Sequence, residues 1–216
     1  QNVPGVAACT ATLPRVETIT PGPSVLFVDP PVIPRVVTMQ ATIYATGVSA
    51  PIKAIRIYPS GSMTPILTYN AGSTPPLVVD AALANRAYVT INANTLPAGT
   101  YDVDLDDQST CAAFLPGAFK VVATPTLTVT SMTPAFGSTA QNSASVIAGS
   151  GFVSVPRAYL SPASGTGTAQ ALSAVTFGSA TSLNSVVRSG LTPQAYDLVV
   201  VNPSGTFGIA KNAFTV

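Results

Sequence analysis

Hydrophobic and polar residues alternate with a period of two along much of this chain. The alternation is clearest in residues 101–106, where Tyr, Val and Leu interleave with three Asp residues. Such a pattern predicts a strand with one apolar face and one face of exposed carboxylates. Similar patterns between turn-forming residues predict strands at Ile55 to Tyr58, Tyr88 to Asn92, Leu127 to Thr130 and Tyr196 to Val201. Since no segment has a helical stripe with caps, we predict an all-β chain of antiparallel sandwiches.

The segment from Leu96 to Val121 is repeated from Leu191 to Val216, at an offset of 191 − 96 = 95 residues and without a gap. A repeat of this length is a domain used twice. We therefore predict a first domain over 1–123, with longer loops and a tethered N-terminal tail, and a second domain over 124–216. The short linker at 123–126 contains a proline, which restricts the angle between the domains.

The starts of the two copies are aligned through Ile19-Thr20-Pro21 and Met132-Thr133-Pro134, at an offset of 134 − 21 = 113 residues. The first domain would then carry 113 − 95 = 18 additional residues, which we place around 29–37 and 69–80, where prolines cluster. Long loops on a rigid scaffold often carry binding specificity, although proline-rich edges also serve simply to block association between sheets.

The second domain resembles the IPT/TIG family, an immunoglobulin-like fold found in plexins, some transcription factors and many bacterial surface proteins. The residues that carry the resemblance are Met132-Thr133-Pro134, Phe136-Gly137, Gly149-Ser150-Gly151-Phe152, Ala195 to Gly205 and Asn212 to Val216. The first domain matches through Ile19-Thr20-Pro21, Gly47, Ala98 to Val103 and Gly117-Ala118-Phe119, but has Asp107-Gln108-Ser109-Thr110 in place of the Asn-Pro-x-Gly turn. The resemblance implies two tandem immunoglobulin-like sandwiches.

In such sandwiches Tyr101 and Tyr196 are expected to form tyrosine corners, in which the ring packs inward and the hydroxyl bonds to nearby backbone. Asn202 to Gly205 is expected to form a β-turn, with proline preset for its second position. The resemblance, together with the lack of an N-x-S/T acceptor with a permitted middle residue, favours a bacterial protein.

The chain contains only 8% charged residues, nine basic and eight acidic, against about 25% in average proteins. This deficit favours a secreted or surface-displayed protein, in the periplasm or on the outer surface of a bacterium. The basic residues are scattered, which disfavours nucleic-acid binding. No apolar stretch approaches the roughly 18 residues that span a bilayer, so we expect no membrane insertion.

Two cysteines, Cys9 and Cys111, are expected to form a disulfide that ties the N-terminal tail to the first domain. Two alternatives stay open. One is two free thiols, and the other is lipidation of Cys9, because Val6-Ala7-Ala8-Cys9 resembles a lipoprotein cleavage box.

The absence of histidine excludes Ser-His-Asp and Cys-His catalysis as well as histidine metal sites. With one glutamate and seven aspartates, the chain has little to offer a glycosidase, so we predict a non-enzyme with no cofactor. The aspartate cluster, Asp102, Asp104, Asp106 and Asp107, is a candidate calcium site. The favoured alternative is an acidic face balanced by Arg or Lys on a neighbouring strand.

Carbohydrate binding would use exposed tyrosines, and the candidates in the first domain are Tyr44, Tyr58, Tyr69 and Tyr88. The alternative is that aromatic residues simply suit strand surfaces. A further signal is the segment 198–201, which is apolar on both faces of its strand and must be covered by the first domain, by the loop 166–172 or by another chain.

These features together predict a spacer or adhesion module that presents loops to a protein or glycan partner. Two alternatives are an accessory carbohydrate-binding module of a larger secreted enzyme, and an architectural subunit of a fibre or surface layer that self-associates.

Overall fold

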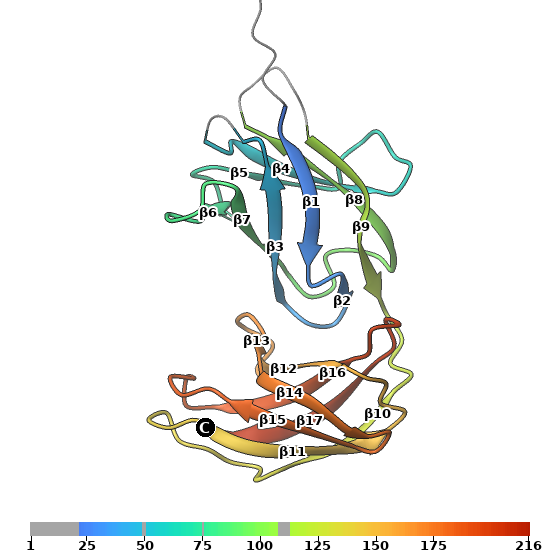
Figure 1. Cartoon of the computed structure of the whole chain (residues 1–216), viewed down its shortest axis with the longest axis vertical. Coiled ribbons are helices and arrows are strands. Elements are labelled where there is room, and N and C mark those ends of the chain that lie inside the picture. Colours follow the sequence, from blue (N-terminus) through green and yellow to red (C-terminus); the bar gives the residue numbers. More distant parts are fainter. Residues whose placement is uncertain (1–21, 49–50, 75, 108–112) are drawn as a thin grey trace, which may run out of the picture.

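A computed structural model describes residues 22–48, 51–74, 76–107 and 113–216 of the chain. These residues form seventeen strands, arranged as two sandwiches stacked along the long axis of the molecule (Figure 1). No helix occurs among them, and thus none that could cross a membrane.

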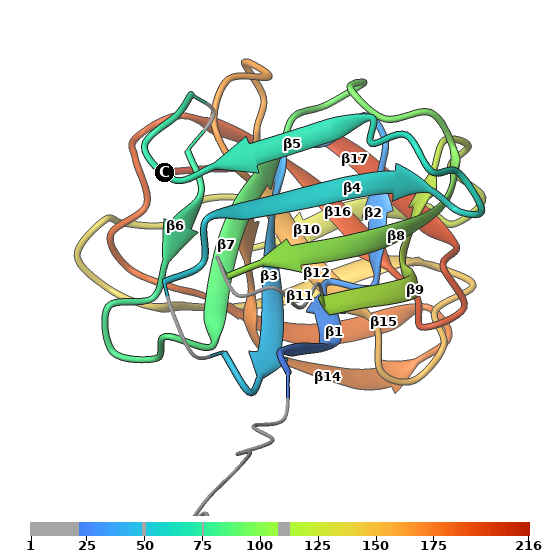
Figure 2. The ribbon, with the colours of Figure 1, turned by 90° about the horizontal axis from the view of Figure 1, so that it is seen from above.

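The first sandwich is built from residues 24–122. One sheet has the order β1 (Ser24–Asp29), β3 (Met39–Thr46), β7 (Arg86–Ile91) and β6 (Val78–Val79). The other has the order β2 (Val32–Pro34), β9 (Ala113–Val122), β8 (Gly99–Asp106), β4 (Ala54–Pro59) and β5 (Leu67–Asn70). Seen from above, β4, β5 and β8 cross over β3 and β7 (Figure 2).

The second sandwich is built from residues 128–215. One sheet has the order β10 (Thr128–Thr133), β11 (Ser143–Ser150), β15 (Ser182–Val187) and β14 (Ser173–Ser179). The other has the order β13 (Gln170–Ala171), β12 (Arg157–Pro162), β16 (Ala195–Val201) and β17 (Phe207–Thr215). The two copies thus repeat the same arrangement.

If β2, β5 and β13 are set aside, each copy has seven strands. The first, second, fifth and fourth of these seven form one sheet, in that order, and the other three form the second sheet. The strand pairs are antiparallel except for the short β2, which runs parallel to β9. This is the strand order of an immunoglobulin-like sandwich. The all-β fold of two tandem immunoglobulin-like sandwiches is therefore confirmed.

The alignment of the two copies at their first strands was wrong. A bulge lies between Val25 and Phe27 where β1 pairs with β3, and its counterpart lies between Val129 and Ser131 where β10 pairs with β11. The offset is 129 − 25 = 104 residues, so Pro30, not Pro21, is the counterpart of Pro134. The three-residue match that includes Pro21 lies outside the described residues, and a short match of this kind is weak evidence in a chain with 20 prolines.

The first sandwich therefore carries 104 − 95 = 9 additional residues rather than 18. The offset is still 162 − 59 = 103 at the ends of β4 and β12, and it falls to 182 − 86 = 96 at the starts of β7 and β15. Seven of the additional residues consequently lie between β4 and β7. This connection includes the expected segment 69–80, whereas 29–37 is not an insertion.

The turn between β16 and β17 has the expected form. The amide of Gly205 donates to the carbonyl of Asn202 at 2.9 Å, and Gly205 has a φ of 90°, which suits glycine. The buried Asn202 side chain fixes the turn by accepting from the Val153 amide and donating to the Gly151 carbonyl.

The outer face of β16 is covered within the chain, as its apolar pattern required. Val199 and Val201 are 0% and 4% exposed, and they belong to the hydrophobic cluster of the first sandwich, together with Tyr159 and Phe207. Ala169, in the loop before β13, packs against the same cluster, and its amide donates to the Thr38 carbonyl at 2.8 Å. We call this contact between the sandwiches the joint.

Candidate functional site

The acidic cluster does not form the exposed face that alternation suggested. Asp102 and Asp104 are only 3% and 6% exposed, and Asp107 is fully buried. Arg56, opposite Asp104 on β4, donates to Asp104 at 2.7 Å and to Asp106 at 2.8 Å. The neighbouring cation that the sequence analysis favoured is thus present, and it covers the carboxylates that were expected to face water.

Asp102 is held by backbone amides. It accepts from Gly117 at 2.7 Å and from Gly61 at 3.2 Å. Burial opposes ionisation of this carboxyl, but the hydrogen bonds from Gly117 and Gly61 outweigh it and lower its pKa. Among the described residues no group of three His, Cys, Asp or Glu side chains is arranged to hold a metal ion. A calcium site at the cluster stays a prediction.

The two tyrosines at matching positions of the repeat bond to backbone four residues earlier in the chain. The Tyr101 hydroxyl donates to the Pro97 carbonyl at 2.7 Å, and the Tyr196 hydroxyl donates to the Thr192 carbonyl at 2.8 Å. The two rings are 3% and 2% exposed, and burial raises the pKa of Tyr101. Each ring packs in the hydrophobic cluster of its own sandwich.

The four candidate ligand tyrosines do not share one face. Tyr69 is 2% exposed and donates to the Thr90 carbonyl at 2.8 Å, and burial raises its pKa to about 12, so its expected exposure was wrong. Tyr58 is half-buried on β4 and meets Phe114 edge-on at 6.1 Å. Tyr58 and Tyr69 lie on one sheet, on β4 and β5, whereas Tyr44 and Tyr88 lie on the other, on β3 and β7.

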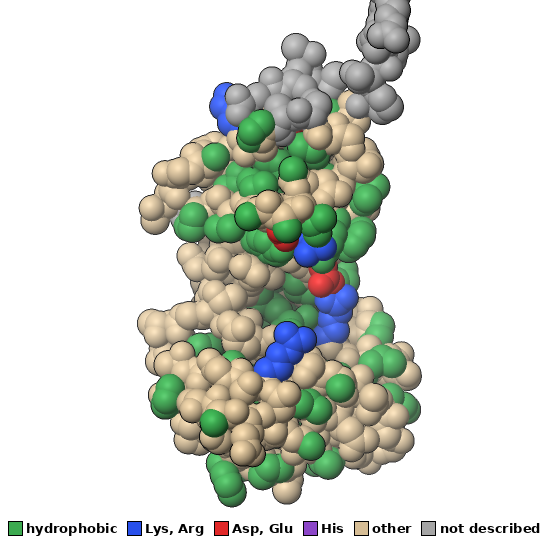
Figure 3. All heavy atoms as spheres, turned by 60° about the vertical axis from the view of Figure 1, so that its left-hand side comes forward, with side chains coloured by type: hydrophobic (Ala, Val, Ile, Leu, Met, Phe, Trp, Pro, Cys, Tyr) green, Lys and Arg blue, Asp and Glu red, His purple; other side chains and the backbone are tan. Residues whose placement is uncertain are grey.

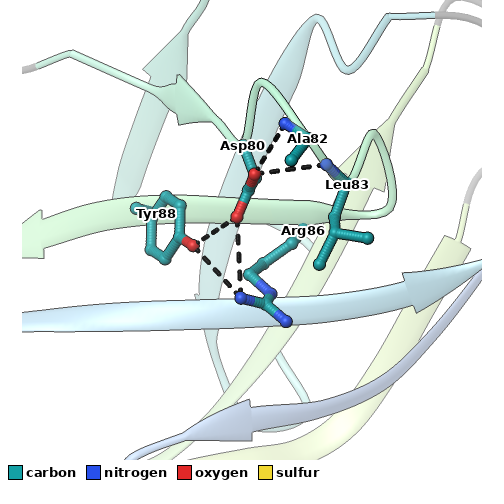
Figure 4. Close-up of polar contacts among 5 residues, drawn as sticks. All are labelled: Asp80, Ala82, Leu83, Arg86 and Tyr88. Atoms are coloured by element: carbon teal, nitrogen blue, oxygen red, sulfur yellow. Dashed lines mark hydrogen bonds and ion pairs between the residues drawn. The ribbon is translucent and has the colours of Figure 1, made fainter.

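Tyr44 and Tyr88 are already engaged by their neighbours. Phe27 stacks on Tyr44 at 4.3 Å from the β1 side, and the Arg86 guanidinium lies 5.0 Å from the ring centroid on the β7 side. The Tyr88 hydroxyl donates to Asp80 at 2.7 Å (Figure 4), a bond that lowers the pKa of Asp80. Ligand contact by Tyr44, Tyr58 and Tyr88 stays a prediction.

The main concave site is a cleft of about 560 Å³ beside the joint. Figure 3 shows the hollow between the two halves of the molecule, with charged side chains gathered beside it. Its polar side chains come from both sandwiches, namely Asp29, Gln40, Thr42, Arg157, Thr168, Gln170, Arg188 and Ser189. A second hollow of about 390 Å³ shares Thr168, Gln170, Gly190 and Leu191 with it, so the cleft continues along the second sandwich.

Arg157 closes one side of the cleft by bridging the sandwiches. Its guanidinium forms an ion pair with Asp29 at the end of β1. Burial disfavours the charge of Arg157, but bonds to Tyr159 and Asp29 outweigh this effect and raise its pKa. Arg188 is exposed at the cleft and has no ion-pair partner among the described residues.

The sequence analysis did not anticipate this cleft. The apolar outer face of β16 predicted that something packs there, and the loop 166–172 was one candidate cover. The polar residues around the contact come from five separate segments of the chain, at 29, 40–42, 157, 168–170 and 188–189. Cys9 and Cys111 lie outside the described residues, so their pairing stays a prediction.

Comparison with known proteins identifies no relative by sequence. No protein-family model matches the chain, and no curated protein matches it. The IPT/TIG assignment consequently stays a prediction, while the immunoglobulin-like architecture rests on the strand order described above.

The solved structures that are similar to this chain include three with low sequence identity. The plexin A4 extracellular region matches with a TM-score of 0.42 and 11% identity, over 82% of this chain and 14% of that one. Murine CEACAM1b matches with a TM-score of 0.31 and 10% identity, over 87% and 95% of the two chains. A Bacteroides ovatus protein, SGBP-B of a mixed-linkage glucan utilization locus, was solved in complex with a mixed-linkage heptasaccharide. It matches with a TM-score of 0.31 and 14% identity, over 82% of this chain and 38% of that one. Likeness at these scores supports no functional argument.

Proposed function

We propose that the chain is a non-catalytic, secreted or surface-displayed module that acts as a stiff spacer and adhesion unit. In this function the two sandwiches are held at one angle, and the cleft beside the joint is presented to a partner. A bacterial periplasm or outer surface is the proposed location.

The observation that supports this function most strongly is burial at the joint. Val199, Val201 and Phe207 belong to the second sandwich, yet they pack in the cluster of the first and are at most 4% exposed. Separating the sandwiches would expose this apolar surface to water. Together with the Asp29–Arg157 ion pair and the Ala169–Thr38 backbone bond, it favours one fixed arrangement over a flexible tether.

The segment 29–37, which was expected to be a long loop that either carries binding specificity or blocks association between sheets, contributes to the joint. Asp29 pairs with Arg157, and Pro30 to Val32 line a small groove of about 250 Å³ with Val201 and Pro203. The remaining candidates for partner contact are the cleft and the longer connection between β4 and β7.

Residual dipolar couplings from one aligned sample of the whole chain test the proposal. We expect a single alignment tensor to fit the amides of both sandwiches. Two independent tensors of clearly different magnitude would show a flexible tether and would overturn the spacer function.

The accessory carbohydrate-binding module is retained as a second candidate, because the cleft is lined by hydrogen-bonding side chains from both sandwiches. The fibre or surface-layer subunit has no comparable support in the described residues. Sedimentation of the intact chain over a range of concentrations would reveal it through self-association.

A further inference from the structure

We propose that the cleft binds a carboxylate-bearing glycan and that Arg188 supplies the cation that pairs with the carboxylate. This inference rests on the proposed function, because it names the ligand of the surface that the fixed joint presents.

The size and lining of the cleft suit a small polar ligand. Its volume of about 560 Å³ lies within the range of roughly 300–1,000 Å³ that ligand sites occupy. Gln40 and Thr42 on one wall make no side-chain hydrogen bond within the described part of the chain. Gln170 on the other wall uses its amide nitrogen for the Thr168 carbonyl, which leaves its side-chain oxygen to accept. Both walls can therefore bond to hydroxyl groups.

The charges in the cleft favour an anion. Arg157 is paired with Asp29, whereas Arg188 is exposed and has no carboxylate partner in the described ranges. The guanidinium group binds carboxylates through two parallel hydrogen bonds, which makes it the preferred side chain for this group. One unpaired arginine beside a neutralised pair gives the cleft a net positive charge.

The same lining argues against a neutral sugar and against a peptide. Neutral sugars depend on an exposed aromatic face, but the aromatic side chains that line the cleft and its continuation in the described part of the chain, Tyr159 and Tyr196, are only 6% and 2% exposed. A peptide that adds a strand needs a free sheet edge, whereas β13 has only two residues and the neighbouring Ala169 amide is already bonded to Thr38.

Calorimetric titration with matched sugars tests the inference. The probes are digalacturonic acid against its dimethyl ester, and 3′-sialyllactose against lactose, so that each pair differs in its acidic group. We expect one acidic sugar to bind at least about tenfold more tightly than its neutral partner, and added salt to reduce that difference. Amide resonances of Thr42 and Gly190 should shift on binding.

Arg188→Gln should weaken binding of the acidic sugar by about tenfold without lowering the melting temperature, because Arg188 is exposed. Arg35→Gln removes another exposed arginine, one that does not line the cleft, and it should leave the affinity unchanged. Equal affinity for acidic and neutral sugars, tighter binding of a triaspartate peptide, or no binding at millimolar concentration would each overturn the inference. None of these outcomes alters the dipolar couplings of the free chain, so the spacer function is judged separately.

Discussion

Two adjacent valines on β16 allow a sharp test of the joint. Val199 and Val200 are both 0% exposed, but Val199 packs in the cluster of the first sandwich and Val200 in the cluster of the second. Aspartate at either position would bury an unpaired charge, which costs several kcal/mol. The two variants differ in how the protein can relieve that cost.

In Val199→Asp, the cost of burying the charge can be relieved by opening the joint. Full burial contributes about 1.5–3 kcal/mol for each Val or Phe, so Val199, Val201 and Phe207 together hold the joint with roughly 5–9 kcal/mol at most. The true value is smaller, because the second sandwich itself covers part of these side chains. The desolvation cost is therefore large enough to populate an open form in which both sandwiches remain folded. Val200→Asp can only be relieved by unfolding the second sandwich.

Small-angle X-ray scattering and far-ultraviolet circular dichroism distinguish these results. We expect Val199→Asp to increase the radius of gyration and keep the β signal, and Val200→Asp to lose much of that signal. An unchanged radius of gyration and melting temperature for Val199→Asp would refute the burial of Val199 between the two sandwiches. Loss of the β signal equal to that of Val200→Asp would show that Val199 belongs to the core of its own sandwich.

Three further substitutions test interactions inside the sandwiches. Arg56→Gln should lower the free energy of unfolding by about 1–3 kcal/mol, measured by urea denaturation, because it leaves the nearly buried carboxylate of Asp104 without its cation. Lys53 is exposed, so the control substitution Lys53→Gln should have little effect. Tyr196→Phe should cost about 0.5–1.5 kcal/mol in the same assay through loss of its backbone bond, and Tyr58→Phe, for which the structure shows no hydroxyl bond, should cost less. The folded-state pKa of Asp102 is lowered, so its stabilising effect is present above the unfolded pKa of about 3.9 and is lost as pH falls through the folded value. Asp102→Asn should therefore flatten the fall in melting temperature below about pH 4, and an equally steep fall in the variant would contradict this assignment.

The sequence was sufficient to predict the architecture because strand patterns and the repeat are local or directly visible. It was also sufficient to predict that β16 needs a cover on its outer face, since four consecutive apolar residues cannot be half exposed. The burial of Tyr69 and of the aspartates on β8 could not be predicted in this way. Alternation shows which side chains share a face, but not whether a neighbouring strand or side chain covers that face.

The cleft could not be predicted, because it exists only where two sandwiches meet. Asp29 and Arg157 are 128 positions apart in the sequence, and their pairing depends on the angle at the joint. The first-strand alignment was wrong for a related reason. The three-residue match at Ile19-Thr20-Pro21 was a weaker guide to the alignment of the two copies than the shared β-bulge in their first strands, and this bulge cannot be seen in the sequence.

The sheet that contains β4 and β8 and its counterpart with β12 and β16 carry different side chains at matching positions. With the offset of 95 on β8 and β16, Val199 and Val201 occupy the places of Asp104 and Asp106, and with the offset of 103 Tyr159 occupies the place of Arg56. The second sandwich thus has an apolar contact surface at these positions, while the first sandwich has a cation held between two anions. The first sandwich does not use this face at the joint, where it contributes Asp29 and Thr38 at the ends of its strands. The contact between the sandwiches is therefore directional, because the apolar face that the second sandwich packs on the first has no apolar counterpart at the matching positions of the first.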